Sequence, residues 1–251
     1  MDARERLLVA LDGGEPDRVP CALAFYHVDV KSVVPWDRHR DGTVSVQFVR
    51  FPPSPEEEEL SRQAKPYSGD TRLGSVSQVT TYLHWRYRPE TPDERNPLAL
   101  ARSLDDLHDF DFPDLSAPYR AKGLAKQVKA LHKRGLAAGG NLPHLGGELF
   151  EAAWRLRGLE NFLLDLVERP DWAHYILDQL ADLARRNAET LARAGVDVLA
   201  LDDDVGMPRA MMIGPHHWRE FFKPRLAAII EAARAIKPDL RILFHSDGYF
   251  E

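Results

Sequence analysis

Hydrophobic and polar positions follow two different periods along this chain. From about residue 119 onward, helical patterns of a dozen or more residues alternate with short apolar runs of strand length. This repetition predicts successive strand–helix units and a parallel sheet. The predicted strands cover residues 136–140, 196–201 and 240–244. The predicted helices cover residues 121–134, 148–168 with a break at Gly158, 171–194 under an Asp171 cap, and a stretch from Pro215 that Pro224 interrupts.

The first residues predict a helix followed by a buried strand. Asp2 stands where a helix cap is expected, Leu7 and Leu11 recur at helical spacing, and Gly13 ends the pattern. The near-continuous apolar run over residues 19–26 is typical of a strand that is covered on both faces.

Residues 29–118 have a different character. They are rich in proline, and the acidic run 56–59 favours a solvated helix start. Short alternating pieces at 44–49 and 75–82 indicate hairpins on a surface. We therefore expect one domain over residues 1–251, with 29–118 as an inserted surface region.

Composition narrows the class of protein. A chain of 251 residues with 44% hydrophobic content can bury an ordinary core. The net charge of −6 comes from 33 basic and 39 acidic residues that are interspersed, so no basic face for nucleic acid or a membrane is expected. We expect a small-molecule partner instead.

Cysteine usage and the N-terminus bear on location. Cys21 is the single cysteine, which excludes an internal disulfide and a thiolate metal cluster and suits a reducing compartment. The N-terminus lacks the apolar core of a signal peptide, and no run approaches the roughly 18 apolar residues of a membrane span. We expect a cytoplasmic protein.

Polar side chains follow each predicted strand in the second half of the chain. The residues concerned are Asn141 and His144, the triplet Asp202, Asp203 and Asp204, and the pair His245 and Asp247. Because the carboxyl ends of parallel strands meet at one edge of a sheet, we expect all of these residues at one face of the molecule.

The aspartate triplet has two interpretations. One carboxylate can cap the loop while the others face water. Alternatively, one or two carboxylates point into a pocket to bind a cation, an N–H donor or a proton, because a buried carboxylate requires such a partner. His245 and Asp247, two apart at a strand end, also allow two interpretations: a hydrogen-bonded pair, or two of the three ligands that a catalytic metal needs.

Five segments together resemble the uroporphyrinogen decarboxylase superfamily, which also includes cobalamin-dependent methyltransferases. They are Arg4–Pro20, Glu151–Phe162, Asp203–Gly206, Trp218–Leu226 and Phe244–Gly248. The resemblance implies a TIM-type (βα)8 barrel with its site at the carboxyl ends of the strands. Since family members continue for two more units, it also implies a barrel that is truncated after about the sixth strand.

Two departures from the family pattern affect the expected function. The decarboxylases carry arginines after the first strand, where Tyr26 and His27 stand here as candidate substrate-binding residues together with Asn141, His144 and Asp202. In the methyltransferases, a His-x-Cys motif binds zinc. His245 matches that histidine, and Asp247 replaces the cysteine.

The resemblance implies a metal-dependent methyltransferase with Asp203 and Asp204 as catalytic residues and His245 and Asp247 as metal ligands. Its expected cofactors are a divalent metal, zinc in the first instance, and a methyl-corrinoid donor for a thiol-like acceptor. A corrinoid protein and a second copy of the chain are the candidate partners. The alternatives are a tetrapyrrole decarboxylase and a non-catalytic ligand-binding paralogue or fragment.

Overall fold

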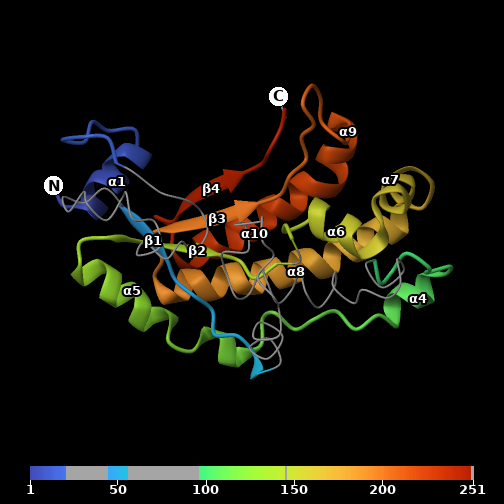
Figure 1. The fold of residues 1–251 in the computed structure, drawn as a ribbon, viewed down its shortest axis with the longest axis horizontal. Coiled ribbons are helices and arrows are strands. Elements are labelled where there is room, and N and C mark those ends of the chain that lie inside the picture. The colour runs from blue at the N-terminus through green and yellow to red at the C-terminus, as the bar shows by residue number, and fades with distance from the viewer. Residues whose placement is uncertain (21–44, 56–95, 145, 250–251) are drawn as a thin grey trace, which may run out of the picture.

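The computed structural model describes residues 1–20, 45–55, 96–144 and 146–249, in which helices and strands alternate (Figure 1). The strands are β1 (Val46–Phe48), β2 (Ala137–Asn141), β3 (Val198–Asp202) and β4 (Arg241–His245). The α-helices are α1 (Ala3–Leu11), α4 (Leu104–His108), α5 (Leu124–Lys133), α6 (Phe150–Arg157), α7 (Leu159–Glu168), α8 (Pro170–Ala194), α9 (Pro215–His217) and α10 (Lys223–Ile236). A 3-10 helix, η3 (Pro118–Ala121), and a π-helical segment, η4 (Trp218–Phe222), complete the described elements.

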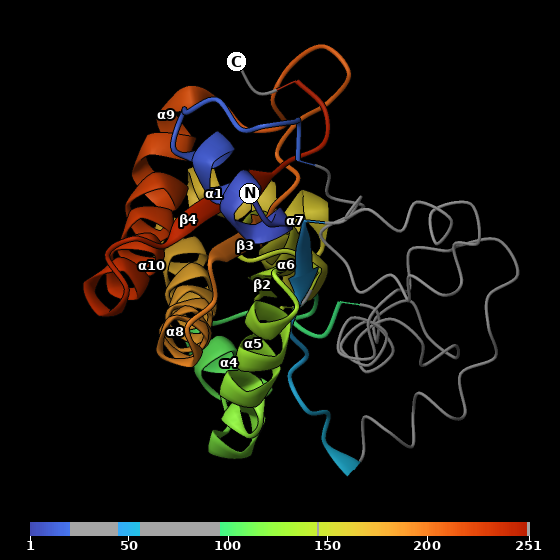
Figure 2. The same ribbon diagram turned by 90° about the vertical axis from the view of Figure 1, so that its left-hand side faces the viewer.

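The four described strands form one parallel sheet in chain order. The connection from β2 to β3 contains α6, α7 and α8, and the connection from β3 to β4 contains α9, η4 and α10. α8 and α10 lie against each other on one side of the sheet (Figures 1 and 2). Neighbouring parallel strands joined by helices on one side are the arrangement of consecutive units in a TIM-type barrel. The predicted α/β class is therefore confirmed, whereas the number of strands and the predicted truncation stay predictions.

The side chains on the two faces of the sheet belong to different hydrophobic clusters. Leu199 and Leu201 of β3 belong to the large core that includes Leu191 of α8. Val198 belongs to a small cluster with Leu7 of α1. Because side chains alternate along a strand, Asp202 shares the face of Val198, at the carboxyl end of β3.

Strand β2 consists of small residues because larger side chains pack closely against both of its faces. A Cβ atom on Gly139 would lie 2.6 Å from the ring of Phe48 in β1. A Cβ atom on Gly140 would lie 2.7 Å from Leu191 on the other face. The glycines let β1 and α8 approach the strand closely, so β2 fits between them.

Helix α1 is held at the amino ends of the strands. Its predicted cap is confirmed, since Asp2 accepts a hydrogen bond from the Glu5 N–H (2.8 Å) and the Glu5 carboxylate accepts one from the Asp2 N–H (2.9 Å). The Arg4 N–H donates to the Gly135 carbonyl, just before β2 (2.8 Å). The Arg4 guanidinium pairs with Asp197, just before β3, at 2.7 Å. The carboxyl ends of β3 and β4 lie at the opposite edge of the sheet.

Part of residues 29–118 enters the core, and the surface hairpin predicted at 44–49 is wrong. Val46–Phe48, expected in a surface hairpin, pairs parallel with β2. An alternating run looks the same in both settings, because the pattern gives the buried face and not the partner strand. Other described residues of the region enter the large core, namely Val49, Phe51, Leu98, Leu107 and Leu115. Most of the expected strand 19–26 and the runs 56–59 and 75–82 lie outside the described residues.

Helix α8 packs against the sheet and supports it. It has 25 residues, begins at Pro170 rather than after an Asp171 cap, and ends at Ala194, where Gly195 caps it with a φ of +90°. The proline sits in the first turn, where its missing N–H costs no hydrogen bond. The helical stretch from Pro215 changes near the predicted place, since the π-helical η4 ends at Phe222 and α10 begins at Lys223 with Pro224 in its first turn. Among the described helices, none has the length and apolar character needed to cross a lipid bilayer.

Candidate metal centre

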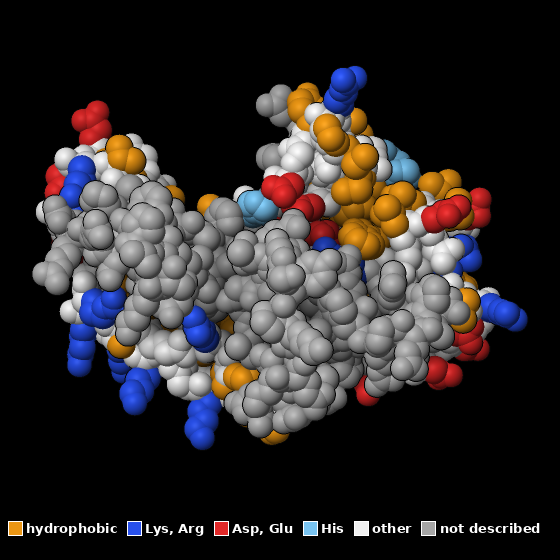
Figure 3. Space-filling model, in the orientation of Figure 1, with side chains coloured by type: hydrophobic (Ala, Val, Ile, Leu, Met, Phe, Trp, Pro, Cys, Tyr) orange, Lys and Arg blue, Asp and Glu red, His pale blue; other side chains and the backbone are white. Residues whose placement is uncertain are grey.

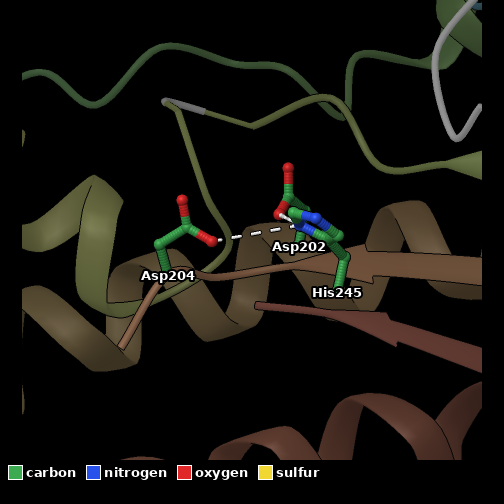
Figure 4. Close-up of side chains that lie close together, drawn as sticks. All are labelled: Asp202, Asp204 and His245. Atoms are coloured by element: carbon green, nitrogen blue, oxygen red, sulfur yellow. Dashed lines mark hydrogen bonds and ion pairs between the residues drawn. The ribbon is translucent and has the colours of Figure 1, made fainter. Parts of the chain in front are cut away.

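The ends of β3 and β4 bring an imidazole and two carboxylates together (Figure 4). Asp202 and His245 are paired in the register of the two strands, and His245 Nδ1 lies 2.7 Å from Asp202 Oδ1. Asp204 Oδ1 lies 3.9 Å from the same nitrogen. One ligand atom from each residue lies within 4.8 Å of the others, and all three residues are partly buried. This group is a candidate cation site.

Asp247 lies beside this group without belonging to it. Its carboxylate is 3.4 Å from His245 Nε2, on the other side of the ring, and its side chain is 79% exposed. Its backbone N–H donates to Asp204 Oδ1 (2.6 Å). The predicted ligands His245 and Asp247 are thus close together, but the three-residue group combines His245 with Asp202 and Asp204.

The charges around His245 favour its protonated form when no cation is present. Burial alone would lower the pKa of His245, but the hydrogen bond and charge of Asp202 and the charges of Asp247 and Asp204 raise it overall. Three carboxylates therefore stabilise a positive charge on the imidazole ring. The same carboxylates would stabilise a bound cation.

Asp203, a predicted catalytic residue, turns away from this group towards α6. Its carboxylate is buried and accepts hydrogen bonds from the N–H groups of Phe150 (2.8 Å) and Glu151 (2.9 Å). These donors belong to the first turn of α6, where N–H groups have no partner within the helix. Burial raises the pKa of Asp203 to about 7 against the effect of these two donors. Asp203 thereby attaches α6 to the end of β3.

Two glutamates at the start of α6 complete the acidic surroundings. Glu148 is buried, its carboxylate accepts the Asp202 N–H (2.6 Å), and its own N–H donates to the Asp202 carbonyl (3.1 Å). Burial raises the pKa of Glu148 well above its usual range, and the charges of Asp202 and Asp203 add to the shift. Burial also raises the pKa of Glu151 to about 6, although its partner Arg155 opposes the shift. Sequence reasoning missed both residues, because it treated the segment only as the start of a helix.

The loop between β2 and α6 depends on two glycines and a histidine. Gly146 and Gly147 have φ values of +100° and +148°, and their N–H groups donate to Nδ1 of the buried His144. Burial lowers the pKa of His144, so its ring is neutral and carries its proton on Nε2. Of the other predicted substrate-binding residues, Asn141 ends β2, and Tyr26 and His27 lie outside the described residues.

The loops after β3 and β4 cross in direct backbone contact. A Cβ atom on Gly206 would overlap the Asp247 carbonyl oxygen, and one on Gly248 would lie 2.6 Å from the Gly206 carbonyl carbon. The Val205 N–H donates to Ser246 Oγ (3.2 Å) next to this crossing. The crossing therefore sets the position of Asp204 relative to His245.

The sequence also matches a known family over much of its length. The family model for uroporphyrinogen decarboxylase (URO-D) matches residues 88–250, which is more than half of the chain. The chain belongs to the URO-D family. The matched residues include α6 and both strands that carry the candidate metal centre. Among curated proteins, none matches this URO-D sequence.

The URO-D chain also resembles solved structures. One of them is a methyltransferase from Methanosarcina mazei, which aligns with a TM-score of 0.53 and 17% sequence identity over 99% of this chain and 70% of the other. At this identity the likeness concerns the fold, and it supports the assignment of the sheet to the predicted barrel architecture.

Proposed function

We propose that this URO-D protein is a metal-dependent methyltransferase that transfers a methyl group from a methyl-corrinoid to a thiol-like acceptor. The observation that carries the proposal is the grouping of Asp202, Asp204 and His245 at the carboxyl ends of β3 and β4. Family membership and a fold neighbour that is named as a methyltransferase support the same class of reaction.

The donor set fits a divalent ion. Imidazole and carboxylate oxygens are both ligands of zinc, and a catalytic site uses three protein ligands and keeps one position open. The three ligand atoms lie close enough together for one ion to bridge them after small adjustments. Because two of the ligands are hard oxygen donors, the site also suits manganese or iron in place of zinc.

The protein residues have distinct roles in this scheme. Asp202, Asp204 and His245 would hold the divalent ion, which would supply the positive charge that lowers the pKa of a thiol acceptor. Glu148 holds the backbone of Asp202 through two hydrogen bonds and keeps that ligand in place. Asp247, exposed at 3.4 Å from His245 Nε2, would orient the imidazole ring.

A tetrapyrrole decarboxylase fits the site less well. Carboxylates gather at the ends of β3 and β4, and their charges would repel a substrate with many carboxylates of its own. An assay with uroporphyrinogen tests this alternative, and we expect no turnover. Tight ligand binding without turnover of any substrate would instead favour the non-catalytic paralogue.

Metal analysis tests the proposed function directly. Purified wild-type protein, His245→Ala and His216→Ala are dialysed against zinc and analysed by mass spectrometry. His216 is a matched control, since its side chain is 83% exposed on α9. We expect about one bound zinc ion per chain in the wild type and the control and a strong loss in His245→Ala. Equal and negligible zinc in all three proteins would contradict the proposal.

A further inference from the structure

We propose that the methyl acceptor is an uncharged or cationic thiol with a hydrocarbon skeleton, which a wall of methionines beside the cation site holds. This inference rests on the proposed function, because it names the class of the acceptor. The methionine wall consists of Met207, Met211, Met212 and Tyr249.

The methionine wall is built into the two loops that carry the candidate ligands. Met207 follows Asp204 by three residues, and its carbonyl accepts the Tyr249 N–H (2.9 Å). Met211 forms an antiparallel bridge with Gly206, and the Met212 N–H donates to the Val205 carbonyl (2.8 Å). Figure 3 shows hydrophobic side chains rising directly beside a group of acidic and histidine side chains. Because Met207 and Tyr249 follow Asp204 and Asp247 closely in two loops that are bridged to each other, the wall borders the cation site.

The exposed apolar side chains of the methionine wall favour the binding of an apolar ligand. Met207 is 49% exposed and Tyr249 is 46% exposed, whereas Met211 and Met212 are partly buried against the large core. Apolar side chains that lie together at the surface mark binding sites, and methionines adapt to ligands of irregular shape. Against this wall, the hydrocarbon part of an acceptor would leave water while its sulfur reaches the ligands.

The charge beside the wall selects against anions. Asp202, Asp204 and Asp247 lie within a few ångströms of His245, and together with the bound thiolate their charges exceed that of a divalent ion, so a second anionic group on the acceptor would be repelled. Arg209 in the same loop is exposed, but its single charge does not balance this group. A neutral or cationic thiol avoids the repulsion.

Binding of thiols to the cobalt-loaded protein tests the inference. Cobalt(II) replaces zinc, and the absorption band between sulfur and cobalt reports thiol binding without any turnover. Benzyl mercaptan, cysteamine, mercaptopropanol and mercaptopropanesulfonate are titrated in turn. We expect benzyl mercaptan and cysteamine each to bind at least about tenfold tighter than the sulfonate, with the advantage of cysteamine shrinking as added salt screens the charges.

Two variants separate the effect of the methionine wall on thiol binding from the effect of the carboxylate charges. Met207→Gln keeps the size of the side chain and removes its apolar end, so it should weaken benzyl mercaptan about three- to tenfold and leave cysteamine almost unchanged. Val167→Gln is the control, since Val167 is 68% exposed on α7. Equal affinities for all four thiols, or tightest binding of the sulfonate, would overturn the inference alone. No sulfur band with any thiol in protein that holds cobalt would overturn the proposed function together with it.

Discussion

Asp202 and His245 occupy paired positions on two adjacent parallel strands, and their side chains meet at 2.7 Å on the same face of the sheet. The contact joins residues that are 43 positions apart in the chain. It therefore depends on the register between β3 and β4.

Asp202 and Asp247 should differ in their effect on cation affinity. Asp202→Asn removes a charge that faces His245 Nδ1, and it should lower zinc affinity by at least about tenfold. Asp247→Asn changes an exposed carboxylate on the other side of the ring and should lower the affinity by less than about threefold. Isothermal titration with zinc measures both values. A larger loss in Asp247→Asn would restore the ligand pair His245 and Asp247.

Asp203 should matter for stability. Asp203→Ala leaves the N–H groups of Phe150 and Glu151 without their acceptor, so we expect a loss of roughly 1–3 kcal/mol in the free energy of unfolding. Urea denaturation followed by circular dichroism gives the value. Asp111→Ala, at an exposed position, is the control and should change stability by less than about 0.5 kcal/mol. An unchanged unfolding midpoint in Asp203→Ala would show that α6 does not depend on this contact.

Asp197 should make stability depend on pH in the acidic range. Burial alone would raise the pKa of Asp197, but the hydrogen bonds from Arg4, the Ala138 N–H and His132 lower it overall. Since the folded state then binds fewer protons than the unfolded state, this stabilisation is present above the unfolded pKa of about 4 and is lost as the pH falls through the folded value.

Thermal unfolding between about pH 6 and pH 3 checks this expectation. The wild type should lose stability on acidification, and Asp197→Asn should be less stable by roughly 2–4 kcal/mol near neutral pH with a flatter acid limb. Asp178→Asn alters an ion pair whose carboxylate is 63% exposed and should cost less than about 1 kcal/mol. Parallel acid limbs in the wild type and Asp197→Asn would contradict the assignment.

Gly139 should tolerate a methyl group only if Phe48 becomes smaller. Gly139→Ala would bring its Cβ atom to 2.6 Å from the Phe48 ring, so we expect a cost of roughly 1–3 kcal/mol. Combining it with Phe48→Leu should recover part of that cost, which a double-mutant cycle from urea denaturation measures. Additive effects would mean that the two residues do not press on each other in solution.

The sequence predicted the elements well where local chemistry decides them. Asp2 caps a helix as expected, and the predicted strands 136–140, 196–201 and 240–244 overlap β2, β3 and β4. The family resemblance is confirmed by the match over residues 88–250. Periodicity and capping are properties of neighbouring residues, so they can be read without knowledge of the tertiary structure.

Tertiary contacts decide which residues form the candidate site, and local sequence patterns do not reveal those contacts. The pairing of His245 with Asp247 assumed that the strand continues through both residues, but β4 ends at His245 and Gly248 turns with a φ of +83°. Asp202 takes the place next to the ring because of register alone. Glu148 and Glu151 gave no signal of their own, since charged residues at a helix start are usually solvated.

The contact of Gly206 with Gly248 has a consequence for changing the specificity of this protein. The loops after β3 and β4 are in contact at a point that leaves no space for a side chain. A change in the length of one loop would therefore move the other loop as well. An insertion in the methionine wall would displace Asp204 as well and would distort the ligand set. Redesign for new acceptors should therefore exchange side chains at Met207 or Met211 and keep both loop lengths constant.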